Sequence, residues 1–485
     1  MEIVSYKFAL LAITTVFIFY LLNPKHRIIF LVTLSCGFIA SYSYLLLIYI
    51  LVYSVINYYI GICIPESKSK LTLFRIGVFL NLSQLVILKY SSFAIDPFFK
   101  LVNSDIHFSK LSEIIIPVGI SFFTLQGLGY LINIKMGWEK PERRFINFLL
   151  YITFYAKFLC GPIERSNHFL PQLNELNTFN RQNVIEGFRF ILLGLVKKNV
   201  IANQLSLIVN PVYSDIGTYG GGILLIVMLI QPLYIYFDFC GYTDIARGIA
   251  KTYGITLLPN FDRPFFSENV TTFWKRIHMS LAFWFNDYVF KQLSFRLRKW
   301  KTAATIFAVF ITWILFGIWH GAGWNFMVLG LLQALAINFE FFTKRKRYDF
   351  FSKIPAYWRK LIGRLVTYLF YGVSLVFFFS PDFKTSLLYF DRLKWINFSL
   401  PISKALIINN RVNIFSFSIA FGILIILLIM EKISCDMKNK YEKIEILWDS
   451  DKFKHQSLRF VIYYIALFLI LYYGGMQTKF IYFQF

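Results

Sequence analysis

Apolar runs long enough to cross a lipid bilayer recur from one end of the chain to the other, and they restrict the fold more than any other feature. Phe417–Met430 (FSIAFGILIILLIM), for example, is apolar almost without interruption. A helix needs about 20 such residues to span the hydrocarbon core, and only helices or a closed barrel satisfy backbone hydrogen bonds inside a bilayer. The runs lack the alternating pattern of barrel strands. The sequence therefore predicts an all-α integral membrane protein.

The composition agrees with this class and indicates how many helices to expect. The 485 residues are 57% hydrophobic and only 16% charged, with a mean hydropathy of +0.58. Soluble proteins are about 45–50% apolar and about a quarter charged. We expect about ten to twelve transmembrane helices of ~20 residues each. Tyr6–Leu22 is long enough to anchor and lacks a small-residue cleavage site, so this first span is expected to be kept.

Two apolar runs carry residues that a simple spanning helix tolerates poorly. Ile114–Ile134 contains Pro117 and three glycines, which predicts a broken or re-entrant helix buried in protein. The run that begins at Val184 carries four charged residues up to Lys198, which predicts a helix that lies partly along the membrane interface.

The formal net charge of +24 has a simple explanation in membrane topology. Basic residues gather in short loops such as Lys344–Arg347 and Arg296–Lys301, as the positive-inside rule expects, so no nucleic-acid partner is predicted. The same rule places the Lys68–Arg75 loop in the cytoplasm and both termini outside. We expect a modest external loop at 381–411 and a modest internal loop at 431–459.

A histidine stands at the end of one apolar run. Ala303–Ile318 leads into Trp319–Asn325 (WHGAGWN), which places His320 between two tryptophans and beside two glycines. Ionisable groups at membrane depth are costly, so each is by default a functional hypothesis. A buried imidazole tends to be neutral at pH 7 and able to accept a proton, and a positioned base contributes roughly 10²–10⁴ in rate. The alternative is a histidine that only forms hydrogen bonds within a helix bundle or lies at the membrane interface.

A polar and aromatic stretch lies upstream of this histidine. It contains Asp238–Asp244, Pro259–Pro264 and Phe273–Leu281 (FWKRIHMSL) and combines many aromatic residues with many charges. This mixture suits a buried cavity that water can reach. Basic residues there, Lys275 and Arg276 among them and also the later Lys291, could neutralise phosphates of a nucleotide-containing donor. Alternatively, they extend towards anionic lipid headgroups.

Other chemistries fit the sequence less well. Two histidines could ligate a metal, but no third ligand stands at a recognisable spacing, so no metal site is predicted. There is no P-loop, no GxGxxG after a strand and no GxSxG elbow. The five cysteines form no CxxC pattern and are interpreted as packing residues.

An ordered set of motifs resembles the membrane-bound O-acyltransferase (MBOAT) family, in the branch of the bacterial alginate O-acetylation membrane protein. The motifs are Pro117–Phe123, Gly161–Arg165, Phe169–Gln172, Gly194–Lys198, Asp238–Asp244, Asn260–Pro264, Phe273–Leu281, Trp319–Gly330 and the tail Lys479–Phe485. The sequence departs from many relatives at Asn286 and at Lys291–Ser294, on the surface where acceptor or partner contacts would lie.

This resemblance implies a cup-like fold with re-entrant or interfacial helices around a central funnel. It implies one polytopic domain over residues 1–485, with N-terminal spans at 1–112, a catalytic core at 113–345 and C-terminal spans at 346–485. His320 and His278 match the catalytic histidines of the branch. The expected substrate-binding residues are Asn260, Lys275, Arg276, Trp319, Asn325 and Asp238. No bound cofactor is expected, and acetyl-CoA from the cytoplasm is the expected co-substrate.

The predicted function is transfer of an acyl group, chiefly acetyl, from a cytoplasmic thioester to a hydroxyl of an extracytoplasmic polysaccharide or partner protein. The expected partners are the acyl-CoA donor, the polysaccharide, a separate extracytoplasmic acetyltransferase and the lipid bilayer. The expected location is a bacterial inner membrane, with many spans. Within the acyltransferase reading, the alternative is D-alanyl transfer to teichoic acid. A polytopic transporter or flippase, which would consume no thioester, and a non-catalytic scaffold are further alternatives.

Overall fold

The computed structural model describes residues 6–91, 93, 119–159, 161–176, 178–396, 413–436 and 453–474. Every regular element in these ranges is helical, and no strand occurs in them. Within the same ranges, nine helical segments are long and apolar enough to cross a membrane, and a further apolar helix at Leu10–Leu21 is shorter. The predicted all-α membrane class is therefore confirmed. The total of ten to twelve spans, the division at 112 and 345, and the sidedness of the loops stay predictions.

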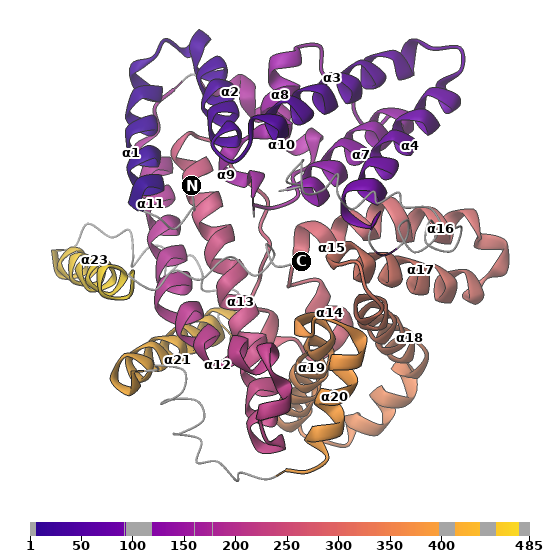
Figure 1. Cartoon of the computed structure of the whole chain (residues 1–485), viewed down its shortest axis with the longest axis vertical. Helices are drawn as coiled ribbons and strands as arrows, with labels where there is room; N and C mark the ends of the chain where they lie inside the picture. Colours follow the sequence, from indigo (N-terminus) through magenta and orange to yellow (C-terminus); the bar gives the residue numbers. More distant parts are fainter. Residues whose placement is uncertain are drawn as a thin grey trace.

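The N-terminal helices form one group, which is blue to violet in Figure 1. They are α1 (Tyr6–Leu21), α2 (Pro24–Ala40), α3 (Tyr44–Glu66), α4 (Lys70–Lys89), α7 (Ile120–Met136), α8 (Phe145–Thr153), α9 (Tyr155–Phe158) and α10 (Ser166–Gln172). Hydrogen bonds between buried polar side chains join α3 to α4: Tyr53 donates to Asn81 at 2.7 Å, and Asn81 donates to Asn57 at 2.7 Å. Such bonds hold membrane helices together where lipid supplies no hydrophobic drive.

Gly119 is the residue directly before α7, and its φ of +76° is left-handed and suits a residue without a Cβ. The run predicted as broken between 114 and 134 thus contains a helix start, while Pro117 and Val118 lie outside the described residues. The predicted loops at 381–411 and 431–459 also fall partly outside them, as do Cys160 and the tail motif Lys479–Phe485.

Helices α11 (Arg181–Leu195) and α13 (Gly221–Thr252) pack closely because glycines face each other at two levels. A Cβ on Gly187 would meet the carbonyl oxygen of Gly248 at 2.7 Å, and one on Gly194 would meet that of Gly241 at 2.6 Å. Small residues at such contacts let helix backbones approach in membranes. The two helices therefore form one closely packed pair.

A π-helical turn, Val196–Ala202, continues α11 into α12 (Asn203–Ser214) and turns two lysines towards α13. Lys197 and Lys198 are buried there and form ion pairs with Asp244 and Asp238 of α13. The sequence had suggested that these charges lie along the membrane interface. The structure differs because each lysine has a carboxylate partner inside the bundle, and paired charges are the ones that burial permits.

Seven further helices lie on the other side of α13 (Figure 1): α14 (Val270–Trp274), α15 (Met279–Phe285), α16 (Lys291–Arg296), α17 (Thr302–His320), α18 (Trp324–Ser352), α19 (Ala356–Phe379) and α20 (Phe383–Leu393). The helices α21 (Ile414–Asp436) and α23 (Phe453–Tyr473) lie instead beside α11 and the π-helical turn. Helices α17 and α18 form a close hairpin. A Cβ on Gly317 would lie 2.2 Å from the carbonyl oxygen of Phe326, and one on Gly330 would lie 2.2 Å from that of Trp313.

Replacing Gly317 by alanine should destabilise the protein by about 1–3 kcal/mol, because the added methyl group meets backbone that can move only if the two helices separate. Gly422→Ala on α21 is the matched control, since nothing lies within 4 Å of its Cβ position. There, alanine should be neutral or slightly stabilising because it favours the helix. Thermal unfolding of both variants in detergent checks this. Equal melting temperatures for the two variants would contradict the close approach.

Candidate active site

His278 occupies a sharp turn between α14 and α15. Its backbone is left-handed, with φ 45° and ψ 45°, a conformation that costs a non-glycine residue roughly 1–2 kcal/mol. Asn260 holds the turn: its carbonyl oxygen accepts from the Met279 amide at 3.0 Å, and its side-chain oxygen accepts from the Ser280 amide at 3.1 Å. Since strain of this kind is kept where it serves a purpose, the turn is a candidate for function.

His320 is the last residue of α17, and side chains from the end of α4 and the residue after it satisfy the carbonyls at this helix end. Lys89 donates its ammonium to the carbonyl oxygen of Trp319 at 2.8 Å and to that of His320 at 3.4 Å. The Tyr90 hydroxyl donates to the carbonyl oxygen of Ile318 at 2.8 Å. A cation at a helix C-terminus is favourable because the terminal carbonyls carry partial negative charge. The position of His320 is therefore fixed from its backbone.

The two imidazoles lie next to each other inside the protein, with the edge of one ring towards the other. Their ring centroids are 6.3 Å apart, and the indole of Trp319 lies 5.6 Å from the His278 ring and 4.9 Å from the His320 ring. Both histidines are buried, with 3% and 6% of their surfaces exposed. Burial lowers the pKa of His278, which lies outside the spanning helices, to about 3, so this imidazole is neutral at pH 7. A neutral imidazole has one nitrogen that can accept a proton.

The two histidines and a set of apolar or aromatic side chains line a small cavity of about 30 Å³. It has room for one or two water molecules or for a group of similar size. The apolar or aromatic lining residues are Ile235, Phe239, Phe261, Trp274, Ile277, Leu329, Tyr371, Leu375 and Phe378. Helix α19 supplies three of them, so a segment outside the predicted core of 113–345 completes the site. The funnel that the family resemblance implies stays a prediction.

A second cavity of about 320 Å³ lies on the other side of Trp274, which lines both spaces. Phe316 also lines the second cavity, and its ring lies 5.1 Å from the His320 ring. The indole of Trp274 donates to Gln333 at 2.9 Å, which fixes its orientation. The exposed Lys275 lies at the edge of this second cavity. A molecule in it would thus be separated from the histidines by two aromatic rings.

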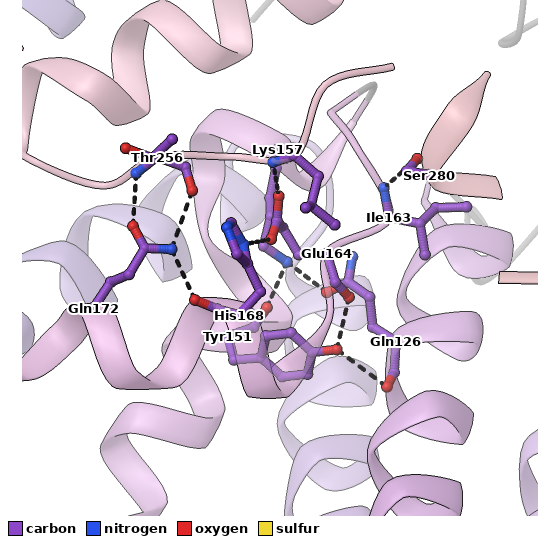
Figure 2. A network of polar contacts seen from close by, with 10 residues as sticks. Gln126, Tyr151, Lys157, Ile163, Glu164, His168, Gln172, Thr256 and Ser280 are labelled. Atoms are coloured by element: carbon purple, nitrogen blue, oxygen red, sulfur yellow. Dashed lines mark hydrogen bonds and ion pairs between the residues drawn. The ribbon is translucent and has the colours of Figure 1, made fainter. Parts of the chain in front are cut away.

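A network of polar contacts lies between the residues that follow His278 and the Gly161–Arg165 motif (Figure 2). The Ser280 hydroxyl accepts from the Ile163 amide at 3.0 Å, which joins the turn to the Gly161–Arg165 motif. The neighbouring Glu164 carboxylate accepts from the Leu258 amide and contacts His168 Nδ1 at 2.8 Å. Because these contacts reach both segments that frame the turn, we infer that the Gly161–Arg165 motif positions the site.

The pair of Glu164 and His168 should make stability depend on pH. The hydrogen bond between the His168 ring and the Glu164 carboxylate raises the pKa of His168 above the ordinary 6.5. The stabilisation is therefore present below about pH 6.5 and is lost as pH rises through the higher pKa of the folded protein. Wild type should lose more thermal stability between pH 6 and pH 8 than His168→Gln does. Parallel melting curves for the two proteins would contradict a protonated His168.

The structure shows where each predicted catalytic or substrate-binding residue lies. His278, His320, Trp319 and Asn260 lie together at the site, as described above. Asn325 instead joins two helices, since its amide donates to the carbonyl oxygens of Phe377 and Ser380 at 3.0 and 2.9 Å. Asp238 forms the buried ion pair with Lys198. The Arg276 carbonyl accepts from the Asp262 amide at 2.9 Å, so its backbone also braces the His278 turn.

Sequence reasoning missed two contributors to the site. Lys89 lies 231 positions before His320 in a helix assigned to the N-terminal spans, and no local pattern linked the two. Trp274 was quoted within a motif but received no role. The signal that could have found Lys89 is a lysine at the end of an apolar run, which is costly unless it has partners.

This fold and site define a helical multi-pass membrane protein in which two buried histidines face one internal cavity. Residues 143–381 match the MBOAT, membrane-bound O-acyltransferase family. The chain belongs to the MBOAT family, as the resemblance of its motifs had indicated.

Curated relatives have several activities in their names. The chain is 29% identical over 318 residues to a protein from Azotobacter vinelandii named probable alginate O-acetylase AlgI, over 64% of this chain and 63% of that protein. It is 28% identical over 404 residues to a peptidoglycan O-acetyltransferase from Helicobacter pylori, over 76% and 74%. A teichoic acid D-alanyltransferase from Bacillus subtilis is 29% identical over 280 residues, over 55% and 69%. The chain spans slightly less than two thirds of the length of the first alginate relatives it matches.

Proposed function

We propose that this protein transfers an acetyl group from a cytoplasmic thioester, acetyl-CoA, to a hydroxyl group of an extracytoplasmic polysaccharide. The observation that carries the proposal is the pair of buried imidazoles on one small apolar cavity in a chain of the MBOAT family. A bacterial inner membrane is the location that this reaction requires, because the donor and the polysaccharide lie on opposite faces. A separate extracytoplasmic acetyltransferase could complete the transfer to the glycan.

The cavity favours acetyl over D-alanyl transfer. Its lining contains the two histidines and otherwise apolar or aromatic side chains, and no acidic side chain of the described residues lines it. A D-alanyl group carries an ammonium, whose burial without a carboxylate partner is costly. Beyond the carbonyl that both acyl groups share, an acetyl group has only a methyl group to bury.

In the proposed reaction, His320 accepts the proton of the acceptor hydroxyl as the hydroxyl oxygen attacks the thioester carbonyl. The C–O bond of the new ester forms, the C–S bond breaks, and the departing thiolate takes the proton from His320. His278, neutral by burial, would donate a hydrogen bond to the carbonyl oxygen as it gains negative charge. Asn260 is a positioning residue because it holds the His278 turn rather than the substrate.

The test is CoA release and labelled acetyl transfer by purified protein in nanodiscs, with membranes of the source cell supplied as acceptor. We expect transfer from acetyl-CoA and none from a carrier-bound D-alanyl thioester. Transfer of D-alanine alone would instead establish the teichoic acid reaction. If folded protein consumes neither donor, the acyltransferase proposal fails and transport becomes the function to test.

A further inference from the structure

A large groove of about 1010 Å³ lies between α18 and α19, away from the histidines. Its lining combines two kinds of side chain. Four are cations, Lys344, Arg345, Arg347 and Arg359. Most others are apolar or aromatic: Val270, Ala336, Phe339, Phe341, Phe342, Tyr348, Phe351, Ile362, Val366 and Phe370. A ligand that fits this groove must have both an anionic and an apolar part.

The groove has more basic than acidic side chains in its lining. Of its two acidic side chains, Glu340 is already engaged, because its carboxylate accepts from the amides of Val270 and Thr271 at 2.6 and 2.9 Å. Among the residues that the structure describes, no ion pair joins Lys344, Arg345 or Arg359 to a carboxylate. The groove is therefore positive on balance and complementary to an anion.

The length of α18 places these cations at the depth of lipid headgroups. The helix has 29 residues, or about 43 Å, whereas the hydrocarbon core is about 30 Å thick. About 20 residues, Trp324–Thr343, suffice for the crossing, so Lys344 and Arg345 begin where the core ends. The exposed Tyr357 and Trp358 at the start of α19 are typical of the same interface. The run Lys344–Arg347 was expected in a loop but belongs to the last turns of α18, and basic residues this close to the end of a membrane span favour the cytoplasmic side.

We propose that this groove binds an anionic phospholipid of the cytoplasmic leaflet. Arg345 and Arg359 would hold the phosphate, since guanidinium groups bind phosphate bidentately. The phenylalanines and aliphatic side chains of α18 and α19 would contact the acyl chains. Glu340 joins the groove to the first residues of α14, the helix that ends at Trp274 beside the histidine cavity. Bound lipid thus holds α18, α19 and α14 together.

The experiment compares two double variants that remove the same charge. Arg345→Gln with Arg359→Gln alters the groove, whereas Lys346→Gln with Lys360→Gln removes cations from the same two segments that do not line it. Each protein is reconstituted in phosphatidylcholine nanodiscs with or without phosphatidylglycerol. Thermal unfolding and native mass spectrometry of the retained lipid are the readouts. Neither depends on acyl transfer, so the result is independent of the proposed function.

We expect phosphatidylglycerol to raise the melting temperature of wild type and of the lysine variant. In the arginine variant the rise should fall to less than half, and retained phosphatidylglycerol should fall roughly tenfold. Arg345→Gln alone should show an intermediate loss. Equal losses in the two double variants would show diffuse surface attraction and overturn the proposal. It is also overturned if wild type shows no preference for the anionic lipid, or if inorganic phosphate alone reproduces the stabilisation.

Discussion

Replacing His320 by alanine should lower acetyl transfer by roughly 10²–10⁴-fold, the range expected when a positioned general base is removed. The imidazole lies at the end of α17, with its ring centroid 6.3 Å from that of His278, and borders the small cavity. Its backbone carbonyl is held by Lys89 independently of the side chain, so the variant should keep the helix end in place. The measurement is labelled acetyl transfer from acetyl-CoA in nanodiscs, at saturating donor.

A matched variant separates loss of chemistry from loss of structure. His26→Ala removes a histidine from the exposed start of α2, far from the site in sequence, and should change neither folding nor transfer. His320→Ala should melt within a few degrees of wild type. Full transfer by a folded His320→Ala protein would remove the histidine from the reaction and leave it a packing residue.

Helices that cross the membrane were predictable from hydropathy alone. The apolar run Ala303–Ile318 became α17 (Thr302–His320) almost unchanged, because a spanning helix must satisfy its own backbone hydrogen bonds and has no alternative partner. His320 was predictable as a candidate for the same reason: an ionisable group at the end of such a run is costly and therefore conspicuous.

The surroundings of the histidines were less predictable, because they depend on contacts between distant segments. The left-handed turn at His278 could not be read from the local sequence, since only a few per cent of non-glycine residues adopt positive φ. Asn260 stabilises the turn from 18 positions away, and Lys89 reaches His320 from another helix group. Only the packed fold brings these groups together.

The surroundings of Asp238 also depend on a residue that is distant in sequence. A carboxylate in a polar, aromatic stretch indicated substrate binding, but its ammonium partner lies 40 positions earlier, in the π-helical turn after α11. Sequence alone shows a costly charge and not the partner that neutralises it. Substrate binding by Asp238 stays a prediction, and the ion pair adds a predicted role in stability that can be tested directly.

Replacing Lys198 by methionine should lower the free energy of unfolding by about 3–5 kcal/mol, because Asp238 would remain buried without its ammonium partner. The side chains of the pair are 1% and 0% exposed, so water cannot replace the lost contact. The exposed pair of Lys394 and Asp391, at 70% and 65%, is the control, and Lys394→Met should cost about 0–1 kcal/mol. Unfolding in a detergent titration measures both. If the cost arises from the unpaired carboxylate, the double variant Lys198→Met with Asp238→Leu should recover much of the stability. A double variant as unstable as the single one would show instead that packing around the lysine, rather than its charge, holds α11 against α13.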